Sequence, residues 1–175
     1  MLVERDISPR RAQVKAVTFA MAGLLGLATF PETGATAGGG PFQGLEGIWG
    51  GNGTVTYSSG TKERLRCRVQ YTMAGNEDSL SQSMRCASDS YKFQINAIYI
   101  HENGNITGNW DEKTLDISGT ITGNASTGHI AAALHGPGFL ADVLVYTNGN
   151  AQTVTIASEG HEIRQVAIEV RKSGN

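Results

Sequence analysis

The chain has 175 residues, of which 39% are hydrophobic and 17% charged, and its formal net charge at neutral pH is −2. This length is enough for one domain with a buried core. The weakly acidic balance argues against nucleic acid or an anionic membrane surface as the general partner.

The first 37 residues have the order of a secretory signal peptide. Basic residues precede a mostly apolar stretch, residues 16–30, and Ala35-Thr36-Ala37 offers a small-residue cleavage site. The stretch is shorter than the roughly 20 residues that a membrane span needs. We therefore expect a periplasmic or secreted protein with no membrane span after cleavage. The pair Arg10-Arg11 is typical of twin-arginine export, but Gln13 replaces the usual Phe, so both export routes stay open.

After an N-terminal extension, residues 38–46, the sequence predicts a single β domain over residues 47–175. Apolar and polar residues alternate in short segments, which are separated by turn signals rich in Gly, Asn and Ser. We predict an all-β fold, a single antiparallel meander β-barrel of about 8–10 strands, because closure leaves no exposed strand edge. A two-sheet β-sandwich is the alternative.

The two cysteines, Cys67 and Cys86, lie symmetrically about the turn-like segment 74–78. A hairpin centred there sets them directly opposite each other, where the Cα atoms of an antiparallel pair are about 4.5–5.5 Å apart and a disulfide can form. Alternation along this hairpin sends apolar residues to one face and arginines to the other. The pattern therefore predicts a disulfide, an oxidising compartment, an apolar inner face and a charged outer face.

Two Asn-Gly dipeptides predict tight hairpins further along the chain. Asn-Gly suits the positive φ angles of a two-residue hairpin loop. With Asn103-Gly104 as the loop, the flanking strands share one apolar face. With Asn148-Gly149 as the loop, Val143 falls opposite Val154 and again one face is largely apolar. Because a slip of one residue would turn each apolar set to the other side, pattern and turn chemistry support each other.

The head of the first predicted strand carries a family resemblance. Gly47-Ile48-Trp49 resembles the Gly-x-Trp opening of lipocalins and other calycin-like barrels, and residues 49–53 are similar to the Trp-x-Gly-x-Gly start of nitrobindin-type ten-stranded barrels. The lipocalin resemblance implies an arginine packed across the tryptophan, a part that Arg164 or Arg171 would take. The nitrobindin resemblance implies haem held by one histidine, for which His161 is the candidate.

The inner and outer faces give two candidate binding surfaces. The inner face would bind a small apolar or amphiphilic molecule, and its expected lining is Trp49, Tyr91, Phe93, Ile95, Tyr99, Trp110 and Phe139. The outer face would bind an anion or an envelope protein through Arg64, Arg66, Arg68 and Arg85. A plain solvated surface is the alternative for the arginines. Glycines within the predicted strands either relieve curvature or leave room for a ligand.

Few residues are arranged for catalysis or metal binding. Cys67 and Cys86 are expected to be oxidised, adjacent Asp111 and Glu112 point to opposite faces of a strand, and the histidines are isolated, so no metal site is predicted. We predict an exported, non-catalytic barrel that binds a small apolar or amphiphilic ligand in its interior without a cofactor. The alternatives are an envelope protein-binding module or hydrolase inhibitor that uses the arginine face, and an uncharacterised barrel enzyme.

Overall fold

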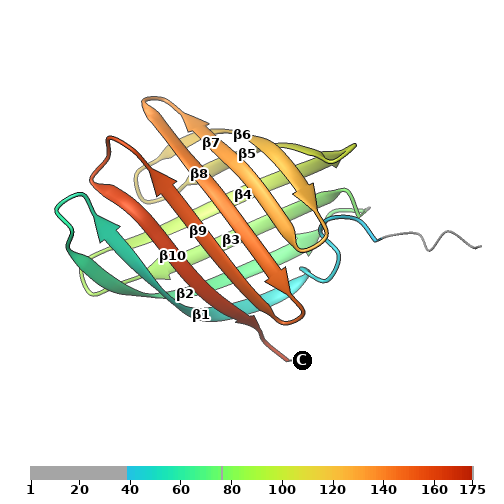
Figure 1. The fold of residues 1–175 in the computed structure, drawn as a ribbon, viewed down its shortest axis with the longest axis horizontal. Coiled ribbons are helices and arrows are strands. Elements are labelled where there is room, and N and C mark those ends of the chain that lie inside the picture. The colour runs from blue at the N-terminus through green and yellow to red at the C-terminus, as the bar shows by residue number, and fades with distance from the viewer. Residues whose placement is uncertain (1–38, 76, 175) are drawn as a thin grey trace, which may run out of the picture. The chain divides into compact units, whose positions relative to one another are not determined.

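The computed structural model describes residues 39–75 and 77–174, so the predicted signal peptide lies outside the described residues. Ten antiparallel strands form one closed barrel (Figure 1). The strands are β1 (Gly47–Tyr57), β2 (Lys62–Met73), β3 (Ser79–Ala87), β4 (Lys92–Glu102), β5 (Asn105–Glu112), β6 (Ile117–Ser126), β7 (His129–Gly136), β8 (Phe139–Asn148), β9 (Ala151–Ser158) and β10 (Ile163–Lys172). Within the described ranges, the structure contains no helix long and apolar enough to cross a membrane.

Each strand pairs with its neighbour in sequence, and β1 also pairs with β10 to close the ring. The all-β prediction and the single antiparallel meander barrel are thus confirmed, and the two-sheet sandwich is not formed. Closure satisfies the backbone hydrogen-bonding groups of β1 on both sides, which an open sheet would leave exposed at its edge.

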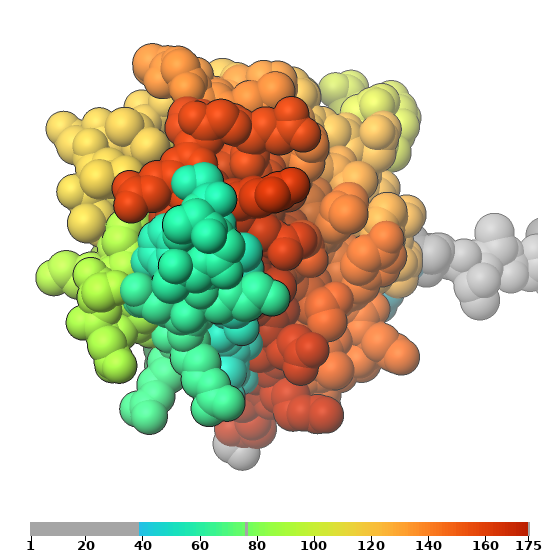
Figure 2. All heavy atoms as spheres, turned by 60° about the vertical axis from the view of Figure 1, so that its left-hand side comes forward, coloured from blue at the N-terminus to red at the C-terminus, as the bar shows by residue number. Residues whose placement is uncertain are grey.

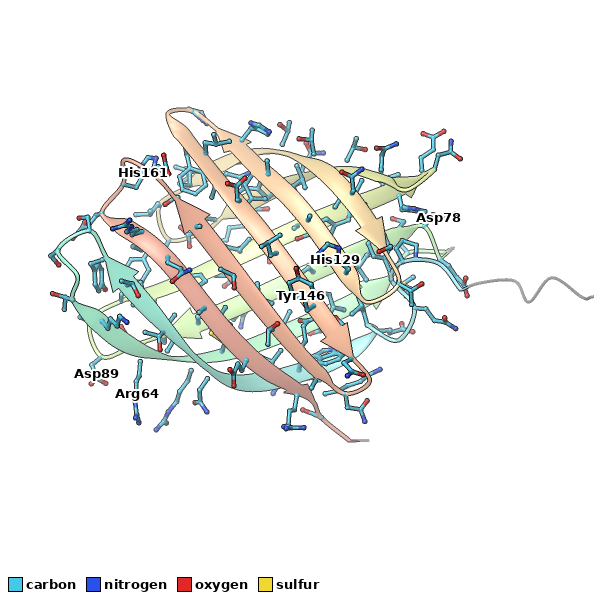
Figure 3. The ribbon with its side chains drawn as sticks, viewed as in Figure 1. Arg64, Asp78, Asp89, His129, Tyr146 and His161 are labelled. Atoms are coloured by element: carbon cyan, nitrogen blue, oxygen red, sulfur yellow. A yellow bond between two sulfur atoms is a disulfide. The ribbon has the colours of Figure 1, made fainter. Side chains whose placement is uncertain are left out.

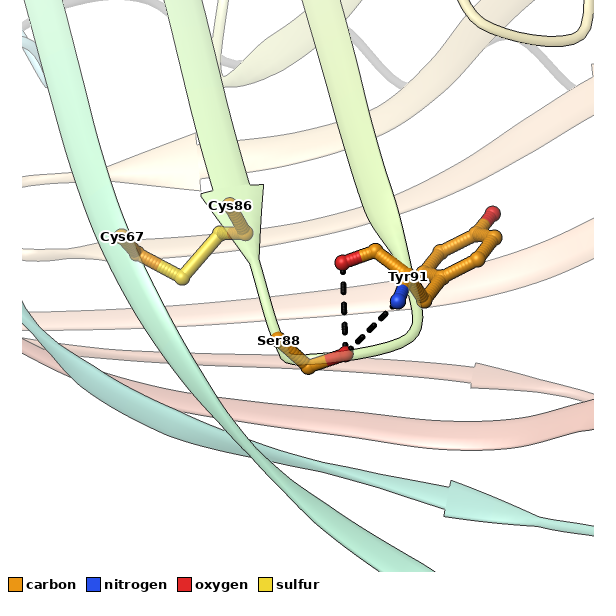
Figure 4. Close-up of a disulfide and its surroundings, with 4 residues drawn as sticks. All are labelled: Cys67, Cys86, Ser88 and Tyr91. Atoms are coloured by element: carbon orange, nitrogen blue, oxygen red, sulfur yellow. Dashed lines mark hydrogen bonds between the residues drawn. A yellow bond between two sulfur atoms is a disulfide. The ribbon is translucent and has the colours of Figure 1, made fainter.

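The cysteine hairpin has the predicted register. Cys67 lies opposite Cys86 and forms a disulfide with it, and the Cα atoms are 4.2 Å apart (Figure 4). Both cysteines are buried with the apolar residues of β2 and β3, whereas the arginines of these strands are exposed. The disulfide indicates a non-cytoplasmic, oxidising compartment. Periplasmic or secreted location stays a prediction.

One predicted hairpin register is wrong by two residues. Asn103 and Gly104 form the β4–β5 loop as expected, with φ angles of 52° and 82°. In the β8–β9 hairpin, however, Asn148 pairs with Ala151, so the loop is Gly149-Asn150 and Val143 lies opposite Ile156 rather than Val154. Gly149, with a φ of 55°, takes the first loop position, where a type II′ turn favours glycine. The slip is even, so every side chain keeps its predicted face.

Glycines on the inner face of β1, β5 and β6 allow neighbouring backbones to approach closely. A Cβ added to Gly108 would collide with the carbonyl oxygen of Ile98, and one added to Gly119 would collide with that of His135. Of the two roles considered for the strand glycines, the structure favours curvature, because the space beside these two is filled by the backbone of the adjoining strand.

A short N-terminal segment, residues 40–45, closes one end of the barrel. Phe42 is fully buried there and packs against the rings of Tyr99 and His101. Leu45 is also buried, and its carbonyl oxygen accepts a hydrogen bond of 2.7 Å from Nε1 of Trp49. The residues that were expected to be a simple extension therefore supply apolar side chains to the core.

Lys172, not an arginine, packs across Trp49. Its Nζ lies 5.9 Å from the centroid of the Trp49 ring and donates a hydrogen bond of 3.0 Å to the carbonyl oxygen of Gly44. Arg164 and Arg171 are both exposed. The expectation that one of them covers the tryptophan is wrong, because Lys172 is the residue that faces Trp49 in the β1–β10 register.

The half of the barrel next to residues 40–45 contains a buried network of polar side chains. The Tyr71 hydroxyl donates to Oε1 of Gln152 at 2.9 Å, and Nε2 of Gln152 donates to Oγ1 of Thr147 at 3.0 Å. Burial raises the pKa of Tyr71, so its hydroxyl keeps its proton at neutral pH. The network joins β2, β8 and β9 across the interior.

Removing the disulfide is expected to lower the free energy of unfolding by about 3 kcal/mol, because the bridge closes a loop across a sequence separation of 19 residues. The variant carries both Cys67→Ala and Cys86→Ala, and urea denaturation measures the change. Wild type that is unfolded and then refolded in reductant serves as the comparison, since it lacks the bond but keeps both side chains. Equal stability of the oxidised and reduced wild type would contradict the expectation.

Candidate functional site

The end of the barrel opposite residues 40–45 opens into a cavity of about 410 Å³. Side chains from inside the barrel line its lower part, and the β3–β4, β5–β6, β7–β8 and β9–β10 loops surround its mouth. At this end the β1–β2 and β9–β10 loops lie next to each other (Figure 2). They are joined by a hydrogen bond of 2.8 Å from the amide of Ser58 to the carbonyl oxygen of Glu162.

Most of the residues predicted for the inner face come together at this cavity. The residues from that set which line it are Tyr91, Phe93, Ile95, Trp110 and Phe139. The other two, Trp49 and Tyr99, are buried deeper in the barrel, Trp49 below residues 40–45 and Tyr99 against Phe42. Lining residues that were not predicted for this set include Glu112, Leu134, Ile156 and Val166, and His161, which was considered only as a haem ligand, also lines the cavity.

The aromatic side chains form pairs around the cavity. The ring centroids of Tyr91 and Phe93 are 6.0 Å apart, and those of Trp110 and Phe139 are 5.4 Å apart. Both separations fall in the range of favourable aromatic contacts. Nε1 of Trp110 donates to the carbonyl oxygen of His135 at 3.3 Å. These contacts hold the rings as walls of the cavity.

Ser88 fixes the loop that positions Tyr91. Its hydroxyl accepts a hydrogen bond of 2.9 Å from the amide of Tyr91 and lies 3.2 Å from the carbonyl oxygen of the same residue (Figure 4). It also donates to a carboxylate oxygen of Glu63 at 2.6 Å. A serine that bonds to the backbone of the residue three positions later is a common way of closing a tight turn. The Tyr91 ring is thereby placed at the mouth.

Glu112 is the one carboxylate that points into the barrel among the described strand residues of the cavity lining, and only 6% of its surface is exposed. Its carboxylate accepts hydrogen bonds from the amide of Gln94 at 2.9 Å and from the amide of Leu115 at 2.6 Å. The sequence contained a signal for it, because Glu112 shares strand parity with Trp110. Adjacent Asp111 points outward and pairs with Lys113.

Glu112 is ionised at neutral pH. Burial opposes the ionised form, but hydrogen bonds from the backbone of Gln94, Leu115 and Thr114 outweigh burial and hold the pKa of Glu112 below its ordinary value. Tyr91 responds to the same charge: burial raises the pKa of its hydroxyl, and the carboxylates of Glu112 and Glu162 raise it further. Two negative charges therefore act at the mouth.

The Ser158 hydroxyl and the His161 ring, two polar groups of the cavity lining, each contact other residues. The Ser158 hydroxyl donates to the carbonyl oxygen of Ile163 at 2.7 Å. The His161 ring packs against Phe139, with centroids 5.2 Å apart. No hydrogen bond joins Ser158 to His161 in the described part of the chain.

The surroundings of His161 fit haem poorly. The His161 ring contacts Phe139 at a tilt of 49°, and the described lining residues include no Lys or Arg that could pair with a haem propionate. The lining instead contains the carboxylate of Glu112, whose negative charge would repel a negatively charged haem propionate. The residues around His161 therefore do not fit a haem group.

The four predicted arginines lie on the outside of β2 and β3, and Figure 3 shows Arg64 pointing away from the barrel. Arg68 lies directly opposite Arg85, as expected from the hairpin register. Within residues 39–75 and 77–174, the ion pairs are His101 with Asp78 and Lys113 with Asp111, and neither involves an arginine.

A broad hollow of about 1440 Å³ lies on the barrel's outer surface beside Arg64 and Arg66. It is larger than the interior cavity, but it is an open surface depression lined mainly by polar residues such as Asn52, Thr153 and Glu169. Apolar enclosure, not volume, distinguishes binding sites for small molecules. The interior cavity is therefore the better candidate for such a ligand.

A scan of protein-family models and a sequence search of curated proteins give no match. Solved structures do match. The crystal structure of Rv2717c from M. tuberculosis has a TM-score of 0.59 at 12% identity and covers 76% of this chain and 95% of that chain. The structure of the S-type phycobiliprotein lyase CPES from Guillardia theta has a TM-score of 0.50 at 12% identity. This match covers 77% of this chain and 92% of that chain. At this identity the likeness shows the fold alone, a closed antiparallel β-barrel.

Glu112→Gln is expected to lower the free energy of unfolding at pH 7 by about 1–3 kcal/mol, because one end of the new amide cannot accept the backbone hydrogen bonds. The difference in free energy of unfolding between wild type and variant should be largest above about pH 4.3, the pKa of glutamate in the unfolded chain. It should shrink as pH falls through the lower folded pKa, since wild-type Glu112 is then protonated as well. Urea denaturation between pH 7 and pH 3 measures both effects.

Glu159→Gln is the matched control, because Glu159 is exposed in the neighbouring β9–β10 loop. A stability difference for Glu112→Gln that stays constant over this pH range would show that ionisation of Glu112 does not stabilise the fold.

Proposed function

We propose that the protein is a non-catalytic, exported calycin-like barrel that binds a small apolar or amphiphilic molecule in its interior. The observation that carries this proposal is the aromatic cavity of about 410 Å³, open at one end of the barrel and closed below by packed side chains. Its volume lies within the roughly 300–1,000 Å³ of typical small-molecule sites. The fold of the solved neighbours supports a barrel, and the ligand is inferred from the cavity alone.

The absence of catalytic activity is part of the proposal. It is supported by the state of the polar groups: the Glu112 carboxylate is held by backbone amides, and the Ser158 hydroxyl is held by a carbonyl oxygen. A general acid or base must reach the reacting group within hydrogen-bond distance, and a nucleophile needs an adjacent base. The barrel-enzyme hypothesis would require these groups to be rearranged.

The neutral fluorescent probe N-phenyl-1-naphthylamine is expected to bind wild-type protein with one site per chain. Ile156→Trp should weaken this binding about 10-fold or more, because Ile156 lines the cavity and the larger side chain occupies the same volume. Probe fluorescence measures the affinity, and far-UV circular dichroism confirms that the barrel is intact.

The control for added aromatic bulk is Ile98→Trp, on the outside of β4, where the side chain is 51% exposed. Failure of the wild type to bind, or equal affinity of the Ile156→Trp and wild-type proteins, would refute interior binding.

A second candidate function uses the arginine face to bind an anionic envelope partner. The observation in its favour is that Arg68 faces Arg85 directly, although like charges at such a position destabilise a sheet unless an anion neutralises them. A folded protein partner with carboxylates on its surface, such as a hydrolase, would supply those anions.

Reversing Arg66 and Arg68 to Glu should reduce retention on immobilised poly-glutamate, so that the variant elutes at lower salt than wild type. The matched control reverses Arg164 and Arg171, which gives the same change of net charge on the outside of β10. If both double variants elute together, the arginine face has no special role beyond overall charge.

A further inference from the structure

The charged groups that line the cavity carry one sign, and Arg164 lies outside the lining, in a neighbouring hollow that it shares with Glu162 and His161. Glu112 and Glu162 line the cavity, and none of its described lining residues is Lys or Arg. Lys113 lies in the adjoining β5–β6 loop, but its Nζ pairs with Asp111 at 3.0 Å, and Asp111 is on the outer face of β5. His161 is the remaining titratable base of the lining, and its ring packs on Phe139.

The negative charge of Glu112 is available, although its lone pairs are partly used. The amides of Gln94 and Leu115 donate hydrogen bonds to a carboxylate that can accept about four. These donors are neutral, so the net charge of −1 remains. A bound cation that needs no hydrogen bond, a quaternary ammonium, would be attracted by this charge without displacing the loop.

Aromatic faces stand next to these carboxylates. Tyr91, Phe93, Trp110 and Phe139 all line the cavity, and the faces of such rings attract quaternary ammonium groups through their quadrupoles. Tyr91, Glu112 and Glu162 line the same cavity, and the pKa of Tyr91 is raised by burial and further by the charges of Glu112, Tyr57 and Glu162.

Polarity changes with depth in the cavity. Glu112 ends β5 and Glu162 belongs to the β9–β10 loop, so both lie at the mouth, whereas Ile95, Leu134 and Ile156 extend into the apolar centre of the barrel. At about 30 Å³ for a group the size of water, 410 Å³ holds about 14 groups. That is the size of a short alkyl chain with a compact head group.

We propose that the cavity selects cationic amphiphiles, with a quaternary ammonium head at the mouth between Glu112, Glu162 and the aromatic rings, and an alkyl tail in the barrel interior. This inference rests on the proposed function and adds the chemical class of the ligand to it. It assigns Glu112 and Glu162 as the residues that determine specificity for charge.

Isothermal titration with three probes of equal chain length separates the two proposals. Decyltrimethylammonium, decanol and decanoate are each titrated into the full mature chain below the concentration at which they form micelles. The cation is expected to bind about 10-fold or more tightly than decanol, and decanoate to bind more weakly than decanol. Higher salt should narrow the differences in affinity, because Glu162 is exposed to solvent and its charge is screened by salt.

Charge-neutral variants assign the effect to residues. Glu162→Gln and Glu112→Gln should each reduce the preference for decyltrimethylammonium over decanol by about 3-fold or more, and Glu159→Gln should retain the wild-type preference. Circular dichroism identifies a variant that does not fold. If Glu112→Gln is such a variant, Glu162→Gln still tests the inference, since Glu162 is an exposed loop residue.

The outcomes distinguish this inference from the function on which it depends. Binding of none of the three probes would overturn interior binding itself. Binding of decanol as tightly as the cation, or tighter binding of decanoate, would leave interior binding in place and overturn the cationic preference. A preference that Glu159→Gln reduces as much as Glu162→Gln does would show an effect of net charge alone and would also overturn the assignment.

Discussion

The pairing of β1 with β10 is the constraint on which the rest of the structure depends. Once the last strand bonds to the first, the inward or outward direction of the strand side chains is fixed around the whole ring, because strand residues alternate between the two faces, with one irregularity at Arg164 where β10 pairs with the end of β1. The disulfide, the buried polar network and the aromatic cavity all lie inside for this reason. The arginines of β2 and β3 lie outside for the same reason. A barrel that failed to close would expose the edges of both terminal strands.

Much of the fold could be predicted because two kinds of local pattern agree. The alternation of apolar and polar residues predicted which side chains lie on the inner and outer faces of the sheet, and the turn residues predicted where each strand ends. The Asn148-Gly149 hairpin shows the limit of this agreement: glycine is acceptable at more than one loop position, so turn chemistry allowed a register shift of two, and alternation cannot detect an even shift. The cysteine hairpin escaped this ambiguity because the disulfide requires one particular pairing.

Features that depend on contacts between distant segments were not predictable in the same way. Nothing local marks Phe42 as a core residue, since its partners Tyr99 and His101 are contributed by another part of the chain. The same holds for Lys172 over Trp49, which follows from ring closure. The aromatic residues of the interior cavity were predicted from the sequence but its carboxylates were not, because an acidic residue at an inward position contradicts the usual expectation for a core. Such a departure from the pattern is where a site is expected.

The interior position of the disulfide has a consequence for the order of events in folding. Cys67 and Cys86 are only 6% and 3% exposed, and an attacking thiolate must reach a sulfur atom directly to exchange with the bond. An oxidant can therefore reach these thiols only while the barrel is still open. The cross-link has to form before, or together with, the joining of β1 to β10. Afterwards it is shielded from soluble reductants for as long as the ring stays closed. The oxidation state of the two cysteines is therefore set by the redox conditions during folding and is retained in the folded protein.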